Sequence, residues 1–386
     1  MKLADRMSRL GTETAFEVLA RARALEREGR EIVHLEIGQP DFTTPQHIID
    51  AACEALNTGH TGYGPSAGDP ELRETVAWHI AKTRGFDVDP SEVVIVPGAK
   101  PIIYFGITAC VNEGEEVIYP NPGFPIYESM INFVGAKPVP IPLREKNEFR
   151  LDPEELAALV TPKTRMIIIN SPQNPTGGIL ELSDLEAIAE VAIRNDIIVM
   201  SDEPYEAILY EGTHHSIAAL PGMKERTILL DCFSKSFAMT GWRLGYGVCP
   251  KEVADAIAKL ETNCNSCTTV FVQRAGIAAL KGTMEPTRAM VAEFKRRRDV
   301  IVDGLNLIPG ISCLRPHGAF YSFPNITETG FDCRTLAKKC MDEAGVAVLA
   351  GTAFGEYGEG YLRLSYANSV ENIQKALVNI KAMLAG

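Results

Sequence analysis

Short apolar runs alternate with longer amphipathic stretches through the middle of the chain. Stretches with a helical spacing of apolar residues, such as 101–111 and 180–195, separate several of these runs. Strands that alternate with helices are typical of a largely parallel sheet covered on both faces. The pattern predicts an α/β fold with a mostly parallel seven-stranded sheet between helices. The expected strands lie at 93–97, 116–119, 137–141, 165–170, 197–201, 227–231 and 244–248.

The pattern changes after Glu285-Pro286. A long charged helix is predicted over 287–307, and short strands and helices then follow up to an amphipathic helix at 370–384. We expect this part to form a smaller α+β domain, with an N-terminal helix at 14–28 packed against it. The predicted units are an N-terminal segment at 1–44, a large domain at 45–285 and a small domain at 286–386.

Composition and charge narrow the class of protein. Apolar residues make up 46% of the 386 positions and charged residues 23%, which is ordinary for a globular protein. A net charge of −12 argues against nucleic acid and anionic membranes as partners. No apolar run reaches membrane-spanning length and no apolar signal segment follows Met1, so we expect a cytoplasmic protein.

Two local patterns have simple interpretations. The basic run Phe294–Arg298 is expected to be a solvated face of the long helix, and not a nucleic-acid site. The nine cysteines are scattered and odd in number. Cys264 and Cys267 have metal-ligand spacing, but no second pair or histidine stands nearby in the sequence. We therefore expect free thiols and no metal site.

The chemical candidates follow the predicted strands. The strand at 93–97 runs into Gly98-Ala99-Lys100-Pro101, where the proline favours the start of a helix. Free backbone N–H groups at a helix start form an anion site, although a plain strand–helix turn has the same pattern. After the strand at 165–170, Asn174 precedes a proline and is pushed into an extended conformation. Its side chain then projects, unless the segment is a simple loop.

Three further residues complete this set. Asp202 follows the strand at 197–201, and a buried carboxylate there needs a partner unless it caps a helix. Lys235 lies between two serines after the strand at 227–231, and Arg243 lies eight residues later. A lysine whose pKa is lowered can form an imine with a carbonyl cofactor, and an arginine fork binds phosphate. Ordinary loop charges are the alternative for both cations.

Together these groups suit pyridoxal 5'-phosphate. This cofactor needs a lysine, donors for its phosphate and a carboxylate that keeps the ring nitrogen protonated, so that the ring accepts carbanion electrons. It also needs donors to the ring oxygen. The residues that supply these groups in sequence order are Asn174, Asp202, Tyr205, Lys235 and Arg243.

Several longer strings resemble class I/II pyridoxal-phosphate-dependent aminotransferases, members of the aspartate aminotransferase superfamily of fold type I. The resemblance extends from about Thr14 to the C-terminus. The family implies amino transfer between an L-amino acid and a 2-oxo acid in two half-reactions, in a large domain that binds the cofactor. The strings are EIGQPDFTTP, TGYGPSAGDPELR, SPQNPTGG, SDEPYE, FSKSFAMTGWRLGY, GAFYSFP and GEGYLRLSYAN.

The resemblance implies roles around the cofactor ring. Lys235 is the Schiff-base lysine and, once released, the base and then the acid that moves the Cα proton. Asp202 pairs with the ring nitrogen. Tyr205 and Asn174 donate to the ring oxygen, and Phe124 stacks on the ring face.

It also implies a phosphate site that two subunits share. The backbone N–H groups of Ala99 and Lys100 bind the phosphate together with Ser234 and Arg243. Tyr63 reaches the same phosphate from the neighbouring subunit, which implies a homodimer. Two positions depart from the family pattern without removing a required group, and they are Cys232 and Pro204.

For the substrate, the resemblance makes Arg363 the clamp on the α-carboxylate, with Gly38 and Asn174 beside it. Phe16 lies at the pocket mouth or in the core. No lysine or arginine occurs at 102–135, which favours alanine, branched or aromatic side chains over dicarboxylates. Two possibilities stay open. A cation from the partner subunit could still bind a dicarboxylate, and glutamate could serve as the amino donor.

Two other functions are compatible with the same motifs. The first is β-elimination or cyclisation by a lyase or synthase on this fold. The second is a non-catalytic regulator that keeps the cofactor fold as a ligand sensor, and such proteins carry a separate DNA-binding segment. Little sequence precedes Thr14, which disfavours the regulator. Aminotransferase is the preferred interpretation, with the lyase or synthase as its alternative.

Overall fold

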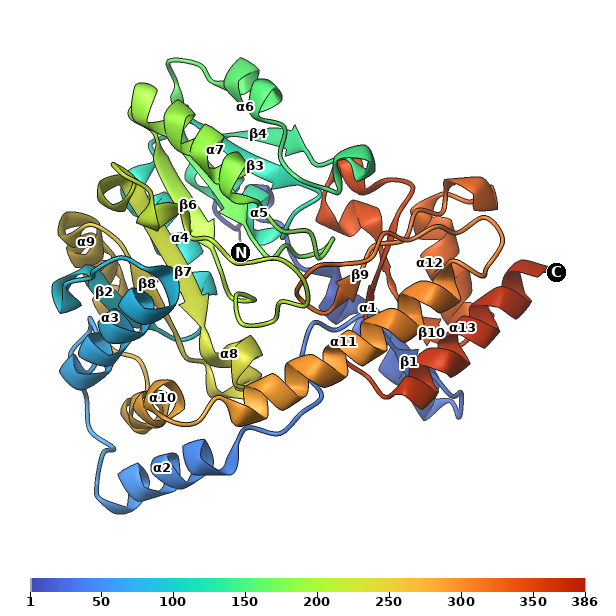
Figure 1. Cartoon of the computed structure of the whole chain (residues 1–386), viewed down its shortest axis with the longest axis horizontal. Coiled ribbons are helices and arrows are strands. Elements are labelled where there is room, and N and C mark those ends of the chain that lie inside the picture. Colours follow the sequence, from blue (N-terminus) through green and yellow to red (C-terminus); the bar gives the residue numbers. More distant parts are fainter. Residues whose placement is uncertain (1, 386) are drawn as a thin grey trace.

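A computed structural model describes residues 2–385 and contains a seven-stranded sheet at its centre (Figure 1). The strand order is β2-β8-β7-β6-β5-β3-β4, and only β8 runs antiparallel to its neighbours. The predicted α/β fold with a mostly parallel sheet is confirmed. The strands are β2 (Val93–Val96), β3 (Glu116–Asn121), β4 (Lys137–Pro142), β5 (Thr164–Asn170), β6 (Ile198–Asp202), β7 (Thr227–Cys232) and β8 (Gly245–Val248).

Helices cover both faces of this sheet, because successive strand residues point to opposite sides. In β2, Val94 and Val96 face one core, whereas Val93 and Ile95 face another. The first face packs against α4 (Lys100–Cys110), α5 (Ile126–Val134) and α9 (Lys251–Cys264). The second face packs against α2 (Gln46–Asn57), α3 (Pro70–Arg84), α6 (Pro153–Leu159), α7 (Leu182–Arg194) and α10 (Val270–Lys281).

A separate hydrophobic core joins α11, α12, α13 and the short strands. These elements lie beside the large sheet (Figure 1). Its small sheet has the order β11-β12-β9, and a second pair joins β1 to β10. The domain boundaries predicted at 44 and 285 stay a prediction. The elements of this part are α1 (Thr14–Arg27), β1 (Val33–His34), α11 (Glu285–Leu305), β9 (Tyr321–Ser322), α12 (Cys333–Asp342), β10 (Val346–Ala347), β11 (Leu349–Ala350), β12 (Leu362–Ser365) and α13 (Val370–Ala385).

The prediction for the basic run of α11 is wrong for two of its arginines. Arg297 and Arg298 are buried, as is Phe294. The Arg298 guanidinium lies 5.0 Å from the Tyr210 ring centroid and donates to the Pro316 carbonyl at 3.0 Å. Positions three and four residues after Phe294 share its helix face, and that face points into the core.

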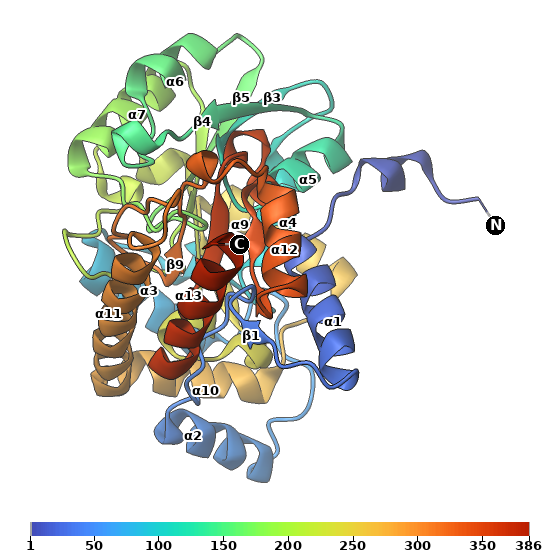
Figure 2. The same cartoon turned by 90° about the vertical axis from the view of Figure 1, so that its right-hand side faces the viewer.

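The N-terminal segment before α1 lies at the edge of the molecule, and its beginning projects outward (Figure 2). It contains the short helix η1 (Asp5–Arg9), which lies against α5. All nine cysteines are free thiols. Among residues 2–385, no helix has the length and apolar character to cross a membrane, and no cluster of metal-binding side chains occurs.

Candidate active site

A cavity of about 640 Å³ opens where the strands of the large sheet end. It joins segments from the large sheet, from α1 and from the small sheet. Tyr63 is the predicted site residue that does not line it, and its side chain is 92% exposed. The predicted residues that line the cavity are Phe16, Gly38, Ala99, Lys100, Phe124, Asn174, Asp202, Tyr205, Ser234, Lys235, Arg243 and Arg363.

The turn between β2 and α4 forms one wall. Gly98 has φ +84°, and a Cβ at this position would lie 2.2 Å from Nη2 of Arg243. Glycine therefore lets the guanidinium approach the start of α4, where backbone N–H groups are free. Arg243 is held in place because it donates to the Thr240 carbonyl at 2.7 Å and to the Pro97 carbonyl at 3.3 Å. A cation beside a helix N-terminus suits a phosphate.

Lys235 lies on α8 (Phe233–Ser236), the short helix that follows β7. Its Nζ donates to the Gly38 carbonyl at 2.6 Å and lies 5.7 Å from the Tyr205 ring centroid. A Cβ on Gly38 would lie 2.1 Å from the Tyr321 hydroxyl oxygen, so only glycine fits here. The amine therefore points into the cavity, between the N-terminal segment and the end of the sheet.

Asp202 ends β6 and is buried. Its Oδ2 accepts a hydrogen bond from the Tyr127 hydroxyl, whereas Oδ1 has no partner among the described residues. Burial raises the Asp202 pKa to about 7; the charges of Asp231 and Glu203 add to this, and the Tyr127 hydrogen bond opposes it. A buried oxygen without a partner is costly, and a donor on a ligand in the cavity would satisfy it.

Tyr205 and Asn174 meet groups from the small sheet. The Tyr205 hydroxyl lies 2.8 Å from that of Tyr321, and burial raises the Tyr205 pKa well above its usual value. Tyr205 therefore stays protonated and can donate. Nη1 of Arg363 donates to Asn174 Oδ1 at 3.2 Å, and Nη2 donates to the Glu36 carbonyl. The Arg363 Nε has no partner among the described residues, so this fork keeps capacity for a carboxylate.

Lys100 and two aromatic rings form the outer wall. The Lys100 ammonium pairs with the Glu13 carboxylate and lies 5.5 Å from the Phe124 ring centroid and 5.9 Å from that of Phe16. From the sequence, only the backbone of Lys100 was assigned a role. Its side-chain cation, which directly precedes the stretch without lysine or arginine, was therefore not predicted in the cavity. Tyr127 was not predicted either, because nothing in the sequence pairs its hydroxyl with Asp202.

The groups present fit pyridoxal phosphate. The cavity combines an amine, an anion site at a helix start and a buried carboxylate oxygen that lacks a donor. The fold and the cavity thus define an α/β enzyme that uses this cofactor. The chain belongs to the aminotransferase class I and II family, whose model matches residues 30–380. The predicted family, cofactor and aminotransferase activity are confirmed.

Similar proteins and solved structures agree with this. The chain is 43% identical over 359 residues to an aspartate aminotransferase from Pyrococcus abyssi, with 92% of each chain covered. It is 40% identical over 388 residues to aromatic-amino-acid aminotransferase 2 from Thermococcus litoralis, covering 100% of this chain and 98% of that protein. The structure of aspartate aminotransferase from Thermus thermophilus with maleate has a TM-score of 0.95 and 37% identity, covering 99% of this chain and 100% of the other.

Proposed function

We propose that this aminotransferase accepts both acidic and aromatic amino acids, with 2-oxoglutarate as an amino acceptor. The observation that carries the proposal is the outer wall of the cavity, where the Lys100 ammonium lies beside the rings of Phe16 and Phe124. The Lys100 ammonium pairs with Glu13, and in this proposal a distal substrate carboxylate replaces or shares that partner. The rings offer an apolar surface to an aromatic side chain. Relatives named for aspartate and for aromatic amino acids support the same breadth.

The residues of the cavity have complementary roles in this proposal. Pyridoxal phosphate supplies an electron sink for the carbanion. Asp202 accepts the ring N–H through its unpartnered Oδ1, Tyr205 donates to the ring oxygen and Phe124 covers the ring face. The phosphate is held by the free N–H groups of Ala99 and Lys100. The side chains that complete the phosphate site are Ser234 and Arg243.

Substrate orientation and proton transfer fall to three further residues. Arg363 binds the α-carboxylate, with Asn174 fixing one side of its guanidinium. Burial of this arginine excludes water and strengthens the pairing. Lys235 removes the Cα proton as a free amine and then returns it on the cofactor side, since its Nζ points into the same cavity.

The role of Lys100 is tested by its replacement with methionine, which keeps the apolar stem and removes the charge. We expect kcat/KM for L-aspartate to fall roughly 10- to 150-fold, because a hydrogen bond to a charged group is worth about 1.5–3 kcal/mol. The value for L-phenylalanine should stay the same or rise. Lys137→Met is the matched control, since Lys137 is exposed on β4 and pairs with Glu116. Equal losses for both amino acids would refute the proposed selectivity.

We further propose a homodimer with shared sites and a cytoplasmic location. Three exposed apolar side chains support the dimer, namely Leu3 and Leu10 on the N-terminal segment and Tyr63. In the dimer, Tyr63 of each subunit contacts the phosphate in the other. The unpaired state of all nine cysteines supports a reducing compartment.

A further inference from the structure

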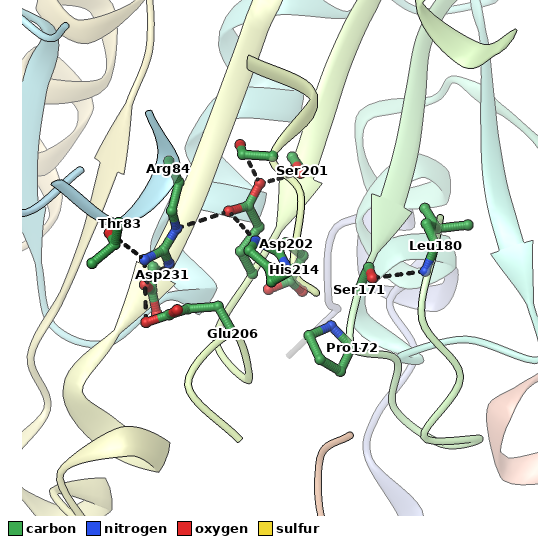
Figure 3. Close-up of polar contacts among 12 residues, drawn as sticks. Thr83, Arg84, Ser171, Pro172, Leu180, Ser201, Asp202, Glu206, His214 and Asp231 are labelled. Atoms are coloured by element: carbon green, nitrogen blue, oxygen red, sulfur yellow. Dashed lines mark hydrogen bonds and ion pairs between the residues drawn. The ribbon is translucent and has the colours of Figure 1, made fainter. Parts of the chain in front are cut away.

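A buried ionic cluster lies close to the cavity and is centred on Arg84, the last residue of α3 (Figure 3). Its side chain has no exposure to solvent. The guanidinium lies 3.2 Å from a Glu203 carboxylate oxygen, 3.1 Å from one of Glu206 and 2.6 Å from one of Asp231. One arginine therefore serves three carboxylates, in a place where a charge left alone is very costly.

The cluster lies directly behind Asp202. Glu203 follows Asp202 at the end of β6, and Asp231 follows Leu230, the residue of β7 that pairs with Asp202. Neighbours in adjacent parallel strands point to the same side, and successive residues point to opposite sides. Glu203 and Asp231 therefore project on the face opposite to Asp202, toward Arg84, as their ion pairs show.

Each carboxylate has other partners as well. Glu203 accepts from Ser201 and Ser216, both at 2.8 Å, and pairs with His214 at 3.0 Å. Asp231 accepts from the Tyr246 hydroxyl at 2.9 Å and from the Cys232 N–H at 2.6 Å. Although burial raises the Glu203 pKa, His214 lowers it, and Arg84 lowers it as well. Arg84 is the cation that faces both Glu203 and Asp231.

The charges behind Asp202 act on its ionisation. Burial raises the Asp202 pKa most, and the anions Asp231 and Glu203 raise it further. Burial also raises the Asp231 pKa to about 7, although Arg84 lowers it. Without the arginine, neighbouring buried carboxylates could not all be ionised, because like charges in a low-dielectric site repel strongly.

We propose that Arg84 is a positioning residue of the reaction, which compensates Glu203 and Asp231 and thereby lets Asp202 remain ionised beside the ring nitrogen of the cofactor. The inference rests on the role proposed above for Asp202 and is independent of the substrate. Arg84 acts through the carboxylates and contacts neither cofactor nor substrate. The ionisable groups around Asp202 and the cluster are His79 and Arg84 from α3, Tyr127 from α5, Glu203, Glu206 and His214 after β6, Asp231 and Cys232 from β7, Lys235 from α8 and Tyr246 from β8.

Infrared difference titration of the full-chain apoenzyme tests the inference, with the Asp202 carboxyl band assigned through Asp202→Asn. Arg84→Met should raise the Asp202 pKa by roughly one unit, and Asp231→Asn should lower it by a similar amount. The double variant Arg84→Met with Asp231→Asn removes one charge of each sign and should return the pKa toward the parent value. Arg297→Met is the matched control, because it removes a buried arginine from α11.

The ring nitrogen gives a second readout in the holoenzyme. With ¹⁵N-labelled cofactor, its chemical shift should report a protonated nitrogen in the parent and loss of that proton in Arg84→Met. If Arg84→Met does not fold, the Asp202 pKa values of Asp231→Asn and of the double variant test the inference. An Asp202 pKa that stays unchanged in folded Asp231→Asn would overturn the inference. An unprotonated ring nitrogen in the parent would instead reject the proposed role of Asp202, and the apoenzyme pKa shifts would still stand.

Discussion

At the scale of single residues, Asp202 joins the cofactor site to the protein interior. The Tyr127 hydroxyl donates to its Oδ2 and lowers its pKa, against the upward effect of burial. Tyr127→Phe removes this donor, so the Asp202 pKa should rise above about 7. The expected result is an upward shift of the Asp202 carboxyl titration in the apoenzyme, measured by infrared spectroscopy.

The matched control is Tyr119→Phe, which removes a hydroxyl from β3 that lies near Glu128 and not beside Asp202. This variant should leave the titration of Asp202 in place. A Tyr127→Phe protein with an unchanged or lower Asp202 pKa would contradict the stabilising role of the hydroxyl.

The candidate residues at strand ends could be predicted from the sequence, whereas the side chains that contact or surround them could not. Lys235, Asp202 and Asn174 follow apolar runs, and the topology brings such positions to one edge. Tyr127 contacts Asp202, and Arg84 contacts the neighbouring Glu203, from helices far away in sequence, so no local spacing marks them. The substrate preference that we propose also depends on such a contact, since the Lys100 side chain pairs with Glu13 on another segment.

At the scale of elements, the start of α4 depends on Gly98. An alanine there would combine a left-handed φ of +84° with a Cβ at 2.2 Å from Nη2 of Arg243. The conformation costs about 1–2 kcal/mol, and the displaced arginine weakens the phosphate site as well. We expect Gly98→Ala to raise the dissociation constant of pyridoxal phosphate by roughly tenfold or more, measured by fluorescence titration of the apoenzyme.

Gly114→Ala is the control for backbone strain. Gly114 also has φ +84°, but a Cβ there would meet nothing within 4 Å. This variant should lose similar thermal stability and retain normal affinity for the cofactor. Equal cofactor affinity in the two variants would show that Arg243 can move without consequence for the phosphate site.

Element boundaries were predicted closely, whereas element pairing was not. The run at 227–231 corresponds to β7 (Thr227–Cys232), and the run at 165–170 to β5 (Thr164–Asn170). Periodicity does not reveal which strands are neighbours, so the place of antiparallel β8 between β2 and β7 emerged only from the structure. The two buried arginines of α11 were predicted to be exposed because they are charged. Their spacing from Phe294, which places them on its buried helix face, was not considered.

At the scale of the whole molecule, the exposed Tyr63 requires a second subunit in our account. Lys235→Ala is expected to be inactive, and it is mixed with a second inactive variant that carries Tyr63→Ala. Part of the activity should return when their subunits exchange, because one site of the hybrid dimer then carries both substitutions and the other carries neither. Activity is measured after mixing, and exchange is verified by mass spectrometry of the hybrid dimer. Complete exchange without recovery would exclude a shared site.

The most direct test of the account concerns the lysine that holds the cofactor. The purified holoenzyme is treated with borohydride, digested and mapped by mass spectrometry. We expect the cofactor to be attached to Lys235, whose amine points into the cavity near Asp202. Lys235→Ala should show no attached cofactor and almost no turnover. Attachment at any other lysine, or an active Lys235→Ala enzyme, would contradict the assignment of this cavity as the active site.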